Sequence, residues 1–399
     1  KYDIILLRKE VKNMGKIIAV SNQKGGVGKS TTVVNLAAVF GLKGKKVLIV
    51  DFDPQGNTTT SFGIKKKSIR NTVFDVIFEE CSIFEAVVPT SCRGVSVVPT
   101  TQDLSGASVS LVNEKDRAMK LRNALMPAKE FYDYIFIDCP PTLDMLTINA
   151  LAAADSVLIP LQCEFLSLEG LVELHNTINR VKVSFNPDLD IEGILFTMCV
   201  ERYKITGQII SEVKKHFAKE VFETTIPRNV ALSEAPSFGE PAIYYDKKAK
   251  GSKAYENLAK EIAKREKKKV AKNKENLNTF MLIHSIIYSI PFVLLFIYFK
   301  INVSLLIIIT LSHLLIDVCS VKLKNKYKEK ECLIFCSDQF IHIFIIYLCS
   351  SYMNLTIILS NMALISILAI LILVKPTGVL ISLAFKVIFK EEKSNHELK

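Results

Sequence analysis

The stretch QKGGVGKSTT occupies residues 23–32, between a short apolar run at 17–20 and a segment of helical periodicity at 31–42. A glycine-rich turn lets backbone N–H groups close around phosphate oxygens, and the N-terminus of the following helix adds the positive end of its dipole. In such a loop the ammonium group of Lys29 reaches the β- and γ-phosphates, and the hydroxyl of Ser30 holds Mg²⁺. The stretch therefore predicts a site for a nucleotide and Mg²⁺ at the start of a helix.

The loop departs from the common pattern GxxxxGK[ST] at its first position. Gln23 stands where that pattern has a glycine, and the motif present is KGGVGK[ST], with an additional lysine at Lys24. A chance glycine turn with surface lysines is the alternative interpretation. The apolar run before the loop and the helical segment after it favour the phosphate loop.

Acidic residues follow two further apolar runs. Asp51 and Asp53 come at the end of VLIVDFD, and Asp138 ends YDYIFID. Taken alone, an acidic residue at a strand end is often a helix cap or a turn residue. Together with the phosphate loop, these positions predict three strand ends that converge on one nucleotide, with Asp138 suited to a Mg²⁺-bound water.

The region from Met14 to about Lys264 alternates short apolar runs with helical segments, such as 31–42 and 166–181. Nearly continuous β-rich runs are typical of parallel strands that are buried on both faces. They lie at 17–20, 47–50, 95–98, 134–137, 157–160 and 193–197. This order predicts a doubly wound, mostly parallel α/β sheet with ligands at the carboxyl ends of its strands.

Composition excludes a disordered chain and a single soluble globule. The 399 residues carry a formal net charge of +11, which favours an anionic partner, yet 49% are hydrophobic. Charge is concentrated before Lys274 and apolar runs crowd the remainder. The nine cysteines show no metal-type pairs in the first 270 residues, which is typical of reduced thiols.

Five segments follow from these patterns. Because the chain opens with Lys1 and Met14 begins MGKIIAVSNQ, we treat the first thirteen residues as an extension of unassigned status. The predicted segments are the extension 1–13, the ATPase domain 14–263, a basic linker 264–277, a membrane region 278–390 and a polar tail 391–399.

The membrane region contains apolar runs of the length that a bilayer requires, ~20 residues. The runs lie at 280–298, 303–320, 332–350 and 355–374, and a shorter run at 378–389 fits the interface. Lysines gather in the linker and in the loop 322–330. Positive charge stays inside, so we expect a multi-pass protein of the inner (cytoplasmic) membrane, with the ATPase domain cytoplasmic and the bilayer as a partner.

Polar side chains inside the predicted spans form a candidate cluster: His284, His313, Asp317, Asp338 and His342. Buried charge at mid-bilayer is costly, so such residues usually face the bundle interior. The pattern HLLID…DQFIH resembles an uncharacterised family of bacterial multi-span membrane proteins, which usually has a further polar helix that is absent here. A structural polar network is therefore favoured over a metal or catalytic site.

The region from residue 14 to about 265 resembles the ParA/Soj family of deviant Walker-A ATPases, in the MinD/ParA class, and most closely its chromosome-partitioning branch. The resemblance rests on KGGVGKST, DFDPQGNTT, IDCPPTLDMLTINAL, PLQCEFLSLEGL and IPRNVALSEAPSFGEP. It implies an ATP-dependent homodimer that hydrolyses ATP, in which Lys24 reaches across to the partner's nucleotide. It also implies that Asp53 positions the attacking water and that Asp138 supports Mg²⁺.

The resemblance extends to other binding residues. Within the phosphate loop it implies ATP contacts from Lys24, Gly25, Gly26, Val27, Gly28, Lys29, Ser30 and Thr31. It places Pro227, Arg228 and Asn229 near the adenine. Family members bind DNA without sequence preference and release it when a ParB-like partner stimulates hydrolysis.

The candidate DNA contacts here are Arg202, Lys204, Lys214 and Lys215. A solvated helix face is an equal alternative for each of them. Ala231 stands where the family often has a basic residue, which predicts weaker DNA binding.

The function expected from the sequence is an ATPase of DNA partitioning, joined to a membrane tail. Three alternatives remain: a MinD-like positioning ATPase at the membrane, a membrane protein whose main function lies in the tail, and a fused reading frame. Permanent spans would conflict with cycling over DNA, and this conflict keeps the alternatives open.

Overall fold

The computed structural model describes residues 14–164, 167–200 and 202–271, with a few isolated positions between 307 and 341. Residues Lys12–Lys268 form one compact unit, and the described residues beyond it belong to a second. The sheet and the helices that cover it belong to the first unit.

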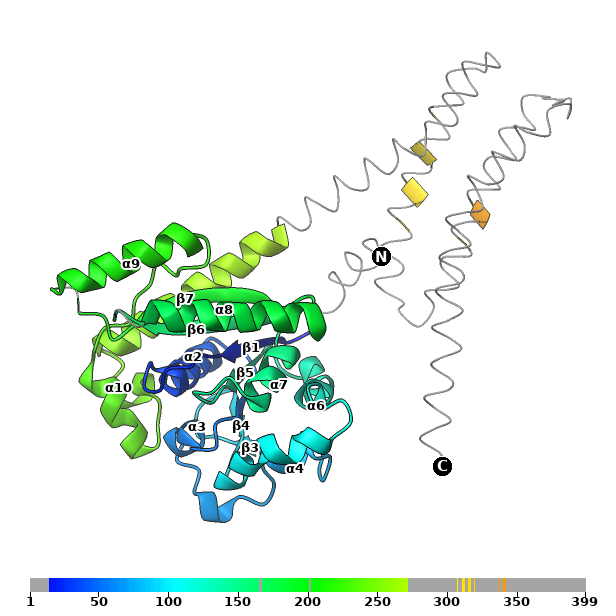
Figure 1. Ribbon diagram of the computed structural model, residues 1–399, viewed down its shortest axis with the longest axis horizontal. Coiled ribbons are helices and arrows are strands. Elements are labelled where there is room, and N and C mark those ends of the chain that lie inside the picture. The colour runs from blue at the N-terminus through cyan, green and yellow to red at the C-terminus, as the bar shows by residue number, and fades with distance from the viewer. Residues whose placement is uncertain are drawn as a thin grey trace, which may run out of the picture. The chain divides into compact units, whose positions relative to one another are not determined.

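One sheet organises this unit (Figure 1). Its seven strands, counted within the described residues, lie in the order β3-β4-β2-β5-β1-β6-β7. Their bounds are β1 Lys16–Val20, β2 Val47–Asp51, β3 Val88–Pro89, β4 Val95–Val98, β5 Tyr134–Asp138, β6 Ser156–Gln162 and β7 Asp190–Thr197. All neighbouring pairs are parallel except β3 with β4, which is antiparallel.

The sheet confirms the predicted doubly wound α/β fold. Each of the six apolar runs forms a strand, and β2 and β5 are buried over their whole length. Only β3 was not predicted, because it has two residues, one of them Pro89, and so carries no periodic pattern.

Helices alternate with the strands along the chain. Their bounds are α2 Lys29–Leu42, α3 Asn57–Ser61, α4 Val73–Ile77, α5 Ala107–Ser110, α6 Lys120–Leu125, α7 Met145–Ala153, α8 Ser167–Ser184, α9 Lys204–Phe217, α10 Val230–Glu234 and α11 Ala242–Tyr245. A short 3-10 helix, η6, spans Ala235–Phe238, and residues 250–271 are also helical.

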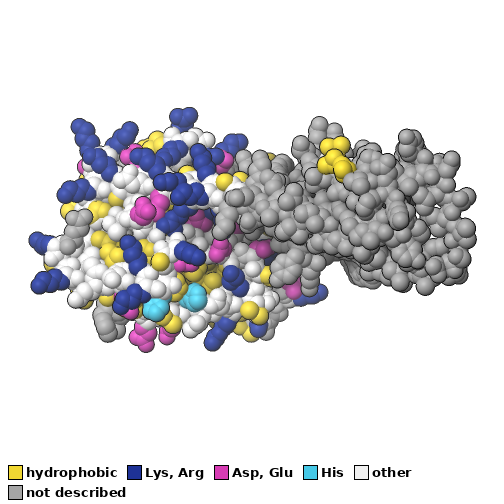
Figure 2. All heavy atoms as spheres, turned by 90° about the horizontal axis from the view of Figure 1, so that it is seen from above, with side chains coloured by type: hydrophobic (Ala, Val, Ile, Leu, Met, Phe, Trp, Pro, Cys, Tyr) yellow, Lys and Arg dark blue, Asp and Glu magenta, His cyan; other side chains and the backbone are white. Residues whose placement is uncertain are grey.

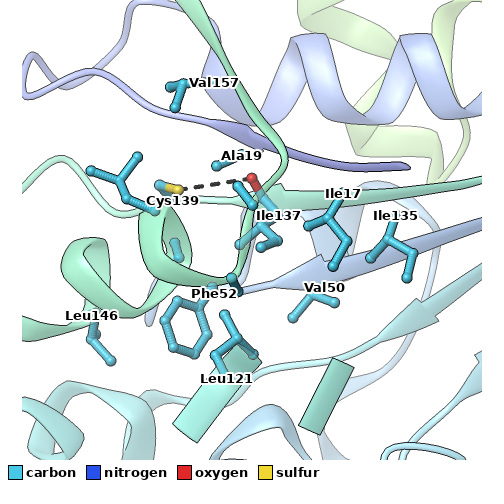
Figure 3. Close-up of a cluster of buried hydrophobic side chains, with 14 of the residues drawn as sticks. Ile17, Ala19, Val50, Phe52, Leu121, Ile135, Ile137, Cys139, Leu146 and Val157 are labelled. Atoms are coloured by element: carbon cyan, nitrogen blue, oxygen red, sulfur yellow. Dashed lines mark hydrogen bonds between the residues drawn. The ribbon is translucent and has the colours of Figure 1, made fainter. Parts of the chain in front are cut away.

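Side chains that alternate along each strand divide the interior into two cores. Ile17 and Ala19 of β1 pack with residues of α4, α6, α7 and α8, as the close-up in Figure 3 shows for part of this core. Ile18 and Val20 pack on the opposite face with α2 and with the helix at 250–271. Because both faces of the sheet are covered, its central strands consist almost entirely of apolar residues.

The helix at 250–271 is held to the sheet by polar contacts as well. Glu266 accepts hydrogen bonds from Lys16 Nζ (2.8 Å) and from the Tyr134 hydroxyl (2.7 Å). Arg265 lies over the ring of Phe222 at 4.3 Å and donates to the carbonyl of Glu220 at 3.1 Å. These contacts fix the C-terminal helix of the unit against the N-terminal end of β1 and the segment after α9.

The predicted membrane localisation requires correction. In the part of the chain that the structure describes, no helix is both long enough and apolar enough to cross a membrane. The 18-residue helix α8, for example, carries Glu169, Glu173, Arg180 and Lys182. This finding contradicts the prediction of a multi-pass membrane protein with the bilayer as partner, which was based on hydropathy and on the distribution of lysines. The four predicted spans themselves lie outside the described residues, and so do His284, His313, Asp317, Asp338 and His342.

Candidate nucleotide site

A cavity of about 470 Å³ opens at the carboxyl ends of the central strands. On one side it is lined by the phosphate loop, including Gly25, Gly26, Gly28, Lys29, Ser30 and Thr31. Asp53 and Gln55 line a second side, and residues from α10 to α11, such as Leu232 and Pro241, line a third. The predicted phosphate loop and one predicted acidic residue therefore face the same space.

The phosphate loop takes its shape from two glycines and three anchoring side chains. Gly26 and Gly28 have φ of 72° and 92°, a left-handed conformation that favours glycine. Thr197 Oγ1 donates to the carbonyl of Val27 at 2.8 Å, and Gln162 Nε2 donates to that of Gly26 at 3.4 Å. Asn22 Nδ2 donates to the Pro160 carbonyl at 2.6 Å. The loop is thus attached to the ends of β6 and β7.

Lys29 begins α2 and is only 6% exposed. Its ammonium group donates to the carbonyl of Lys24 at 3.3 Å. Burial lowers the pKa of Lys29, and the nearby carboxylates of Asp138 and Asp53 oppose that shift. A buried ammonium between two carboxylates and a glycine loop is suited to bind phosphate oxygens.

Lys24 lies at the other end of the loop and is more exposed. Its backbone N–H donates to Asn22 Oδ1 at 2.9 Å, which shapes the turn. Its ammonium group forms an ion pair with Glu164, whose side chain is also largely exposed. Lys24 is outside the cavity lining and contacts an acidic residue of its own chain.

Asp138 ends β5 and is completely buried. Its Oδ2 accepts a hydrogen bond from Thr58 Oγ1 at 2.7 Å, whereas its Oδ1 has no hydrogen-bond partner. Burial raises the pKa of Asp138, against the Thr58 and Ser30 hydroxyls, which favour the carboxylate. The carboxylate therefore sits beside Ser30 with one oxygen available.

Asp51 is the register partner of Asp138 on the adjacent strand β2. Its Oδ2 accepts from the backbone N–H and the hydroxyl of Thr59, at 2.7 and 2.6 Å, and its Oδ1 has no hydrogen-bond partner. Burial and the neighbouring Asp138 raise the pKa of Asp51. The sequence placed Asp51 at a strand end but assigned it no role, and the two threonines that hold these carboxylates, Thr58 and Thr59, were missed.

Asp53 lies just beyond β2 and is 4% exposed. Its Oδ1 accepts from the backbone N–H of Gln55 at 3.0 Å. Burial raises the pKa of Asp53, against the Gln55 N–H and the ammonium groups of Lys29 and Lys66. Lys66 Nζ also donates to the Gln55 carbonyl at 2.7 Å, so it holds the turn that presents Asp53. No sequence pattern had indicated Lys66.

The donors around the loop fit a hard divalent cation. Mg²⁺ prefers oxygen ligands and usually keeps several waters while it contacts one or two carboxylates and substrate phosphates. The Ser30 hydroxyl and the unpartnered buried Oδ1 of Asp138 beside it supply donors of this kind.

The stretch predicted to lie near the adenine borders the site without lining the cavity. Pro227 pairs with Cys199 just beyond β7, and the Arg228 N–H donates to the Cys199 carbonyl at 3.4 Å. Asn229 precedes α10, and its buried Oδ1 has no hydrogen-bond partner. The cavity is lined by the following residues of α10 and η6, such as Leu232, Ser233 and Ala235.

The predicted DNA contacts lie on and before α9 and are exposed. Lys215 forms an ion pair with Glu212 at 2.7 Å, and Arg202 stacks over the ring of Tyr203 at 5.4 Å. Lysine and arginine side chains are numerous on the face of the domain shown in Figure 2. Ala231, where the family often has a basic residue, is 7% exposed and buried within α10.

Comparison with known proteins links this site to nucleotide-binding proteins. Residues 15–191 match a family described as an AAA domain, and residues 259–370 match one described as a protein of unknown function, DUF3307. A solved cobyrinic acid a,c-diamide synthase from Mycobacterium smegmatis, with bound ADP and magnesium, is 34% identical with a TM-score of 0.57. That match covers 64% of this chain and 96% of the other.

A putative plasmid partition protein from Borrelia burgdorferi, bound to AMPPNP, is 26% identical with a TM-score of 0.55; the match covers 63% of this chain and 99% of that one.

Identity is higher to two further relatives. The chain is 53% identical over 253 residues to the chromosome partitioning protein ParA of Myxococcus xanthus, which covers 63% of this chain and 89% of that protein. It is 50% identical over 250 residues to the sporulation initiation inhibitor protein Soj of Bacillus subtilis, which covers 63% of this chain and 99% of Soj. Both relatives are matched along most of their length by the region that builds the sheet and the cavity. The chain therefore belongs to the ParA/Soj family of ATPases.

Proposed function

We propose that this chain binds ATP with Mg²⁺, dimerises in that state on DNA and hydrolyses ATP when a ParB-like partner engages it, and so serves DNA partitioning. One observation carries the proposal. Lys29, Ser30, Asp53 and Asp138 come from three strand ends and meet beside one cavity that the glycine loop lines. The family membership and the nucleotides bound by the similar structures support ATP as the ligand.

The residues divide the work of phosphoanhydride hydrolysis between them. The backbone N–H groups from Gly25 to Thr31 and the Lys29 ammonium bind the phosphates. Ser30 and Asp138 hold Mg²⁺, which when bound neutralises charge on the phosphate oxygens. Asp53, fixed by Gln55 and Lys66, orients the attacking water toward the γ-phosphate.

Lys24 acts on the nucleotide of the second copy. In the single chain its ammonium pairs with Glu164, and the two side chains are 40% and 56% exposed. Exposed ion pairs contribute only about 0–1 kcal/mol, so this pair exchanges readily for a stronger phosphate contact. Hydrolysis then requires the dimer, because the additional positive charge reaches the γ-phosphate only after association.

DNA binding uses the basic side chains of α9 and the loop before it. Arg202, Lys204 and Lys214 are exposed and project from one segment of the surface. Contacts of this type neutralise phosphates without reading bases, which gives binding that is independent of sequence and strongly dependent on salt.

The variant Asp53→Ala tests the proposal. We expect the purified full chain carrying this change to bind ATP and to sediment as a dimer with ATP and Mg²⁺, while phosphate release falls at least 100-fold. Asp103→Ala is the matched control, since Asp103 is an exposed aspartate outside the cavity lining and should leave both properties unchanged. Normal hydrolysis by Asp53→Ala would show that the water is positioned by another group.

A further inference from the structure

Two cysteine side chains meet beside the phosphate loop. Cys163 directly follows β6, and Cys199 lies two residues beyond the end of β7. Gln162 and Thr197 are register partners on these adjacent parallel strands, so both cysteines emerge at the same edge of the sheet. Their Sγ atoms are 3.7 Å apart, within contact distance for two thiols.

We propose that Cys163 and Cys199 form an oxidisable dithiol, a modification site at which hydrogen peroxide produces a disulfide that constrains the phosphate loop. A disulfide requires an Sγ–Sγ distance of about 2.05 Å, and the two sulfurs need to approach by roughly 1.7 Å to reach it. Both residues lie outside the hydrogen-bonded ladder of β6 and β7. Because Cys199 is bridged to Pro227, the approach comes chiefly from the segment that carries Cys163.

The chemical step balances without a further reactant. The Cys163 thiolate attacks one peroxide oxygen, the O–O bond breaks, and the departing hydroxide takes a proton to leave as water, which produces a sulfenic acid. The Cys199 thiol then attacks the sulfenic sulfur, forms the S–S bond and releases the hydroxyl group with its own proton as a second water. Two thiols and one peroxide become one disulfide and two waters, and the peroxide is the oxidant.

The local surroundings select Cys163 as the thiol that reacts first. Cys163 is partly exposed, whereas Cys199 is 7% exposed. Contact with the Cys199 thiol lowers the pKa of Cys163 and favours the nucleophilic thiolate.

The other described cysteines of the domain have raised rather than lowered pKa values. Burial raises the pKa of Cys92 and Cys139, and for the partly exposed Cys81 burial and nearby acidic groups do the same.

The residues next to both cysteines contact the phosphate loop directly. Gln162 donates to the Gly26 carbonyl, and Thr197 donates to the Val27 carbonyl. Glu164, the residue after Cys163, holds Lys24. Met198, the residue before Cys199, lines the cavity and has φ of 51°. Closing the disulfide therefore moves segments that position the loop, and this consequence for nucleotide turnover rests on the proposed function.

Peptide mapping tests the site itself and does not depend on any ATPase activity. The full chain is treated with hydrogen peroxide, remaining thiols are alkylated, and the digest is analysed by mass spectrometry with and without dithiothreitol. We expect a peptide that links Cys163 to Cys199 and disappears on reduction, while Cys81 stays alkylated as a thiol. The absence of that linked peptide, or oxidation of Cys81 at the same rate, overturns the proposal.

A second measurement tests the link to the phosphate loop. We expect peroxide to lower ATP turnover of the full chain at least threefold, reversibly, and to leave Cys199→Ser unaffected, with Cys81→Ser inhibited like the unmodified chain. Equal inhibition of Cys199→Ser overturns the coupling to turnover. If the chain lacks ATPase activity, the proposed function fails, whereas the linked peptide still reports on the dithiol.

Discussion

Replacing Lys29 with methionine removes the ammonium group at the centre of the proposed phosphate site and keeps most of the side-chain volume. In the proposed complex this group donates to the β- and γ-phosphates. Hydrogen bonds to charged groups contribute about 1.5–3 kcal/mol each, so two of them account for about 3–6 kcal/mol of binding. Since about 1.4 kcal/mol corresponds to a tenfold change in affinity, the Kd for ATP should rise by about 10²–10⁴-fold.

The fold should tolerate this change. Lys29 is 6% exposed and burial lowers its pKa, which means that keeping the ammonium in this position is itself unfavourable. Its loss relieves that cost but leaves Asp138 and Asp53 without their nearest positive charge. The two effects oppose each other, and the melting temperature without nucleotide should change by only a few degrees.

Isothermal titration calorimetry with a non-hydrolysable ATP analogue and Mg²⁺ measures the predicted loss. Lys24→Met is the matched control, because it removes the same charge from the same loop at a position outside the cavity lining. We expect that control to bind within about threefold of the unmodified chain and to lose turnover. A Kd that rises less than tenfold in Lys29→Met, or equally in both variants, would refute the assignment of Lys29 to the phosphates.

Three further predictions concern packing, pH and DNA. In Gly41→Ala the new Cβ would lie 2.1 Å from the Arg93 carbonyl oxygen, so we expect a loss of about 1–3 kcal/mol in thermal denaturation, whereas Gly106→Ala, with no atom within 4 Å of its Cβ, should be neutral. Burial acts to raise the pKa of Glu261, but hydrogen bonds from the N–H groups of Glu223 and Thr224 and the charge of the Arg265 guanidinium hold it below its ordinary value of 4.5. The stability that these contacts with the Glu261 carboxylate contribute is therefore complete above pH 4.5 and is lost as the pH falls further. Glu261→Gln should be less stable by about 1–2 kcal/mol at pH 7 with a gap that closes in acid, and a constant gap in urea titrations would contradict this. Because Glu212 neutralises Lys215, Lys214→Ala should weaken DNA binding more than Lys215→Ala does. In fluorescence anisotropy it should also lower the slope of log affinity against log salt concentration by about 1. Equal effects of the two substitutions would contradict DNA binding through α9.

Much of the fold could be predicted because buried segments have recognisable patterns of apolar residues in the sequence. Strands covered on both faces read as continuous apolar runs, as β2 and β5 do, and glycines at positive φ mark the loop before α2. β3 left no such trace, since two residues are too few for a period. The hydropathy of the C-terminal third led to the membrane localisation that the described helices contradict.

The expected site residues come from one local motif, whereas residues that depend on strand pairing were missed. Lys29 and Ser30 follow from the loop sequence alone. The contact of Thr58 with Asp138 depends on the pairing of β2 with β5, and no local pattern encodes that register, whereas Thr59 contacts Asp51 on its own segment. The contact between Cys163 and Cys199 likewise depends on the register of β6 with β7.

The strand order has a mechanical consequence. The phosphate loop is fastened to β6 and β7, whereas Asp51 and Asp138 belong to β2 and β5, and β1 runs between the two groups. A nucleotide bound with its cation would contact both groups of strands at once. Nucleotide binding would therefore reduce the relative motion of the two groups of strands across β1, and loss of the γ-phosphate would restore it. Amide hydrogen exchange along β1 would then slow when nucleotide binds, which makes the central strand a reporter of the nucleotide state.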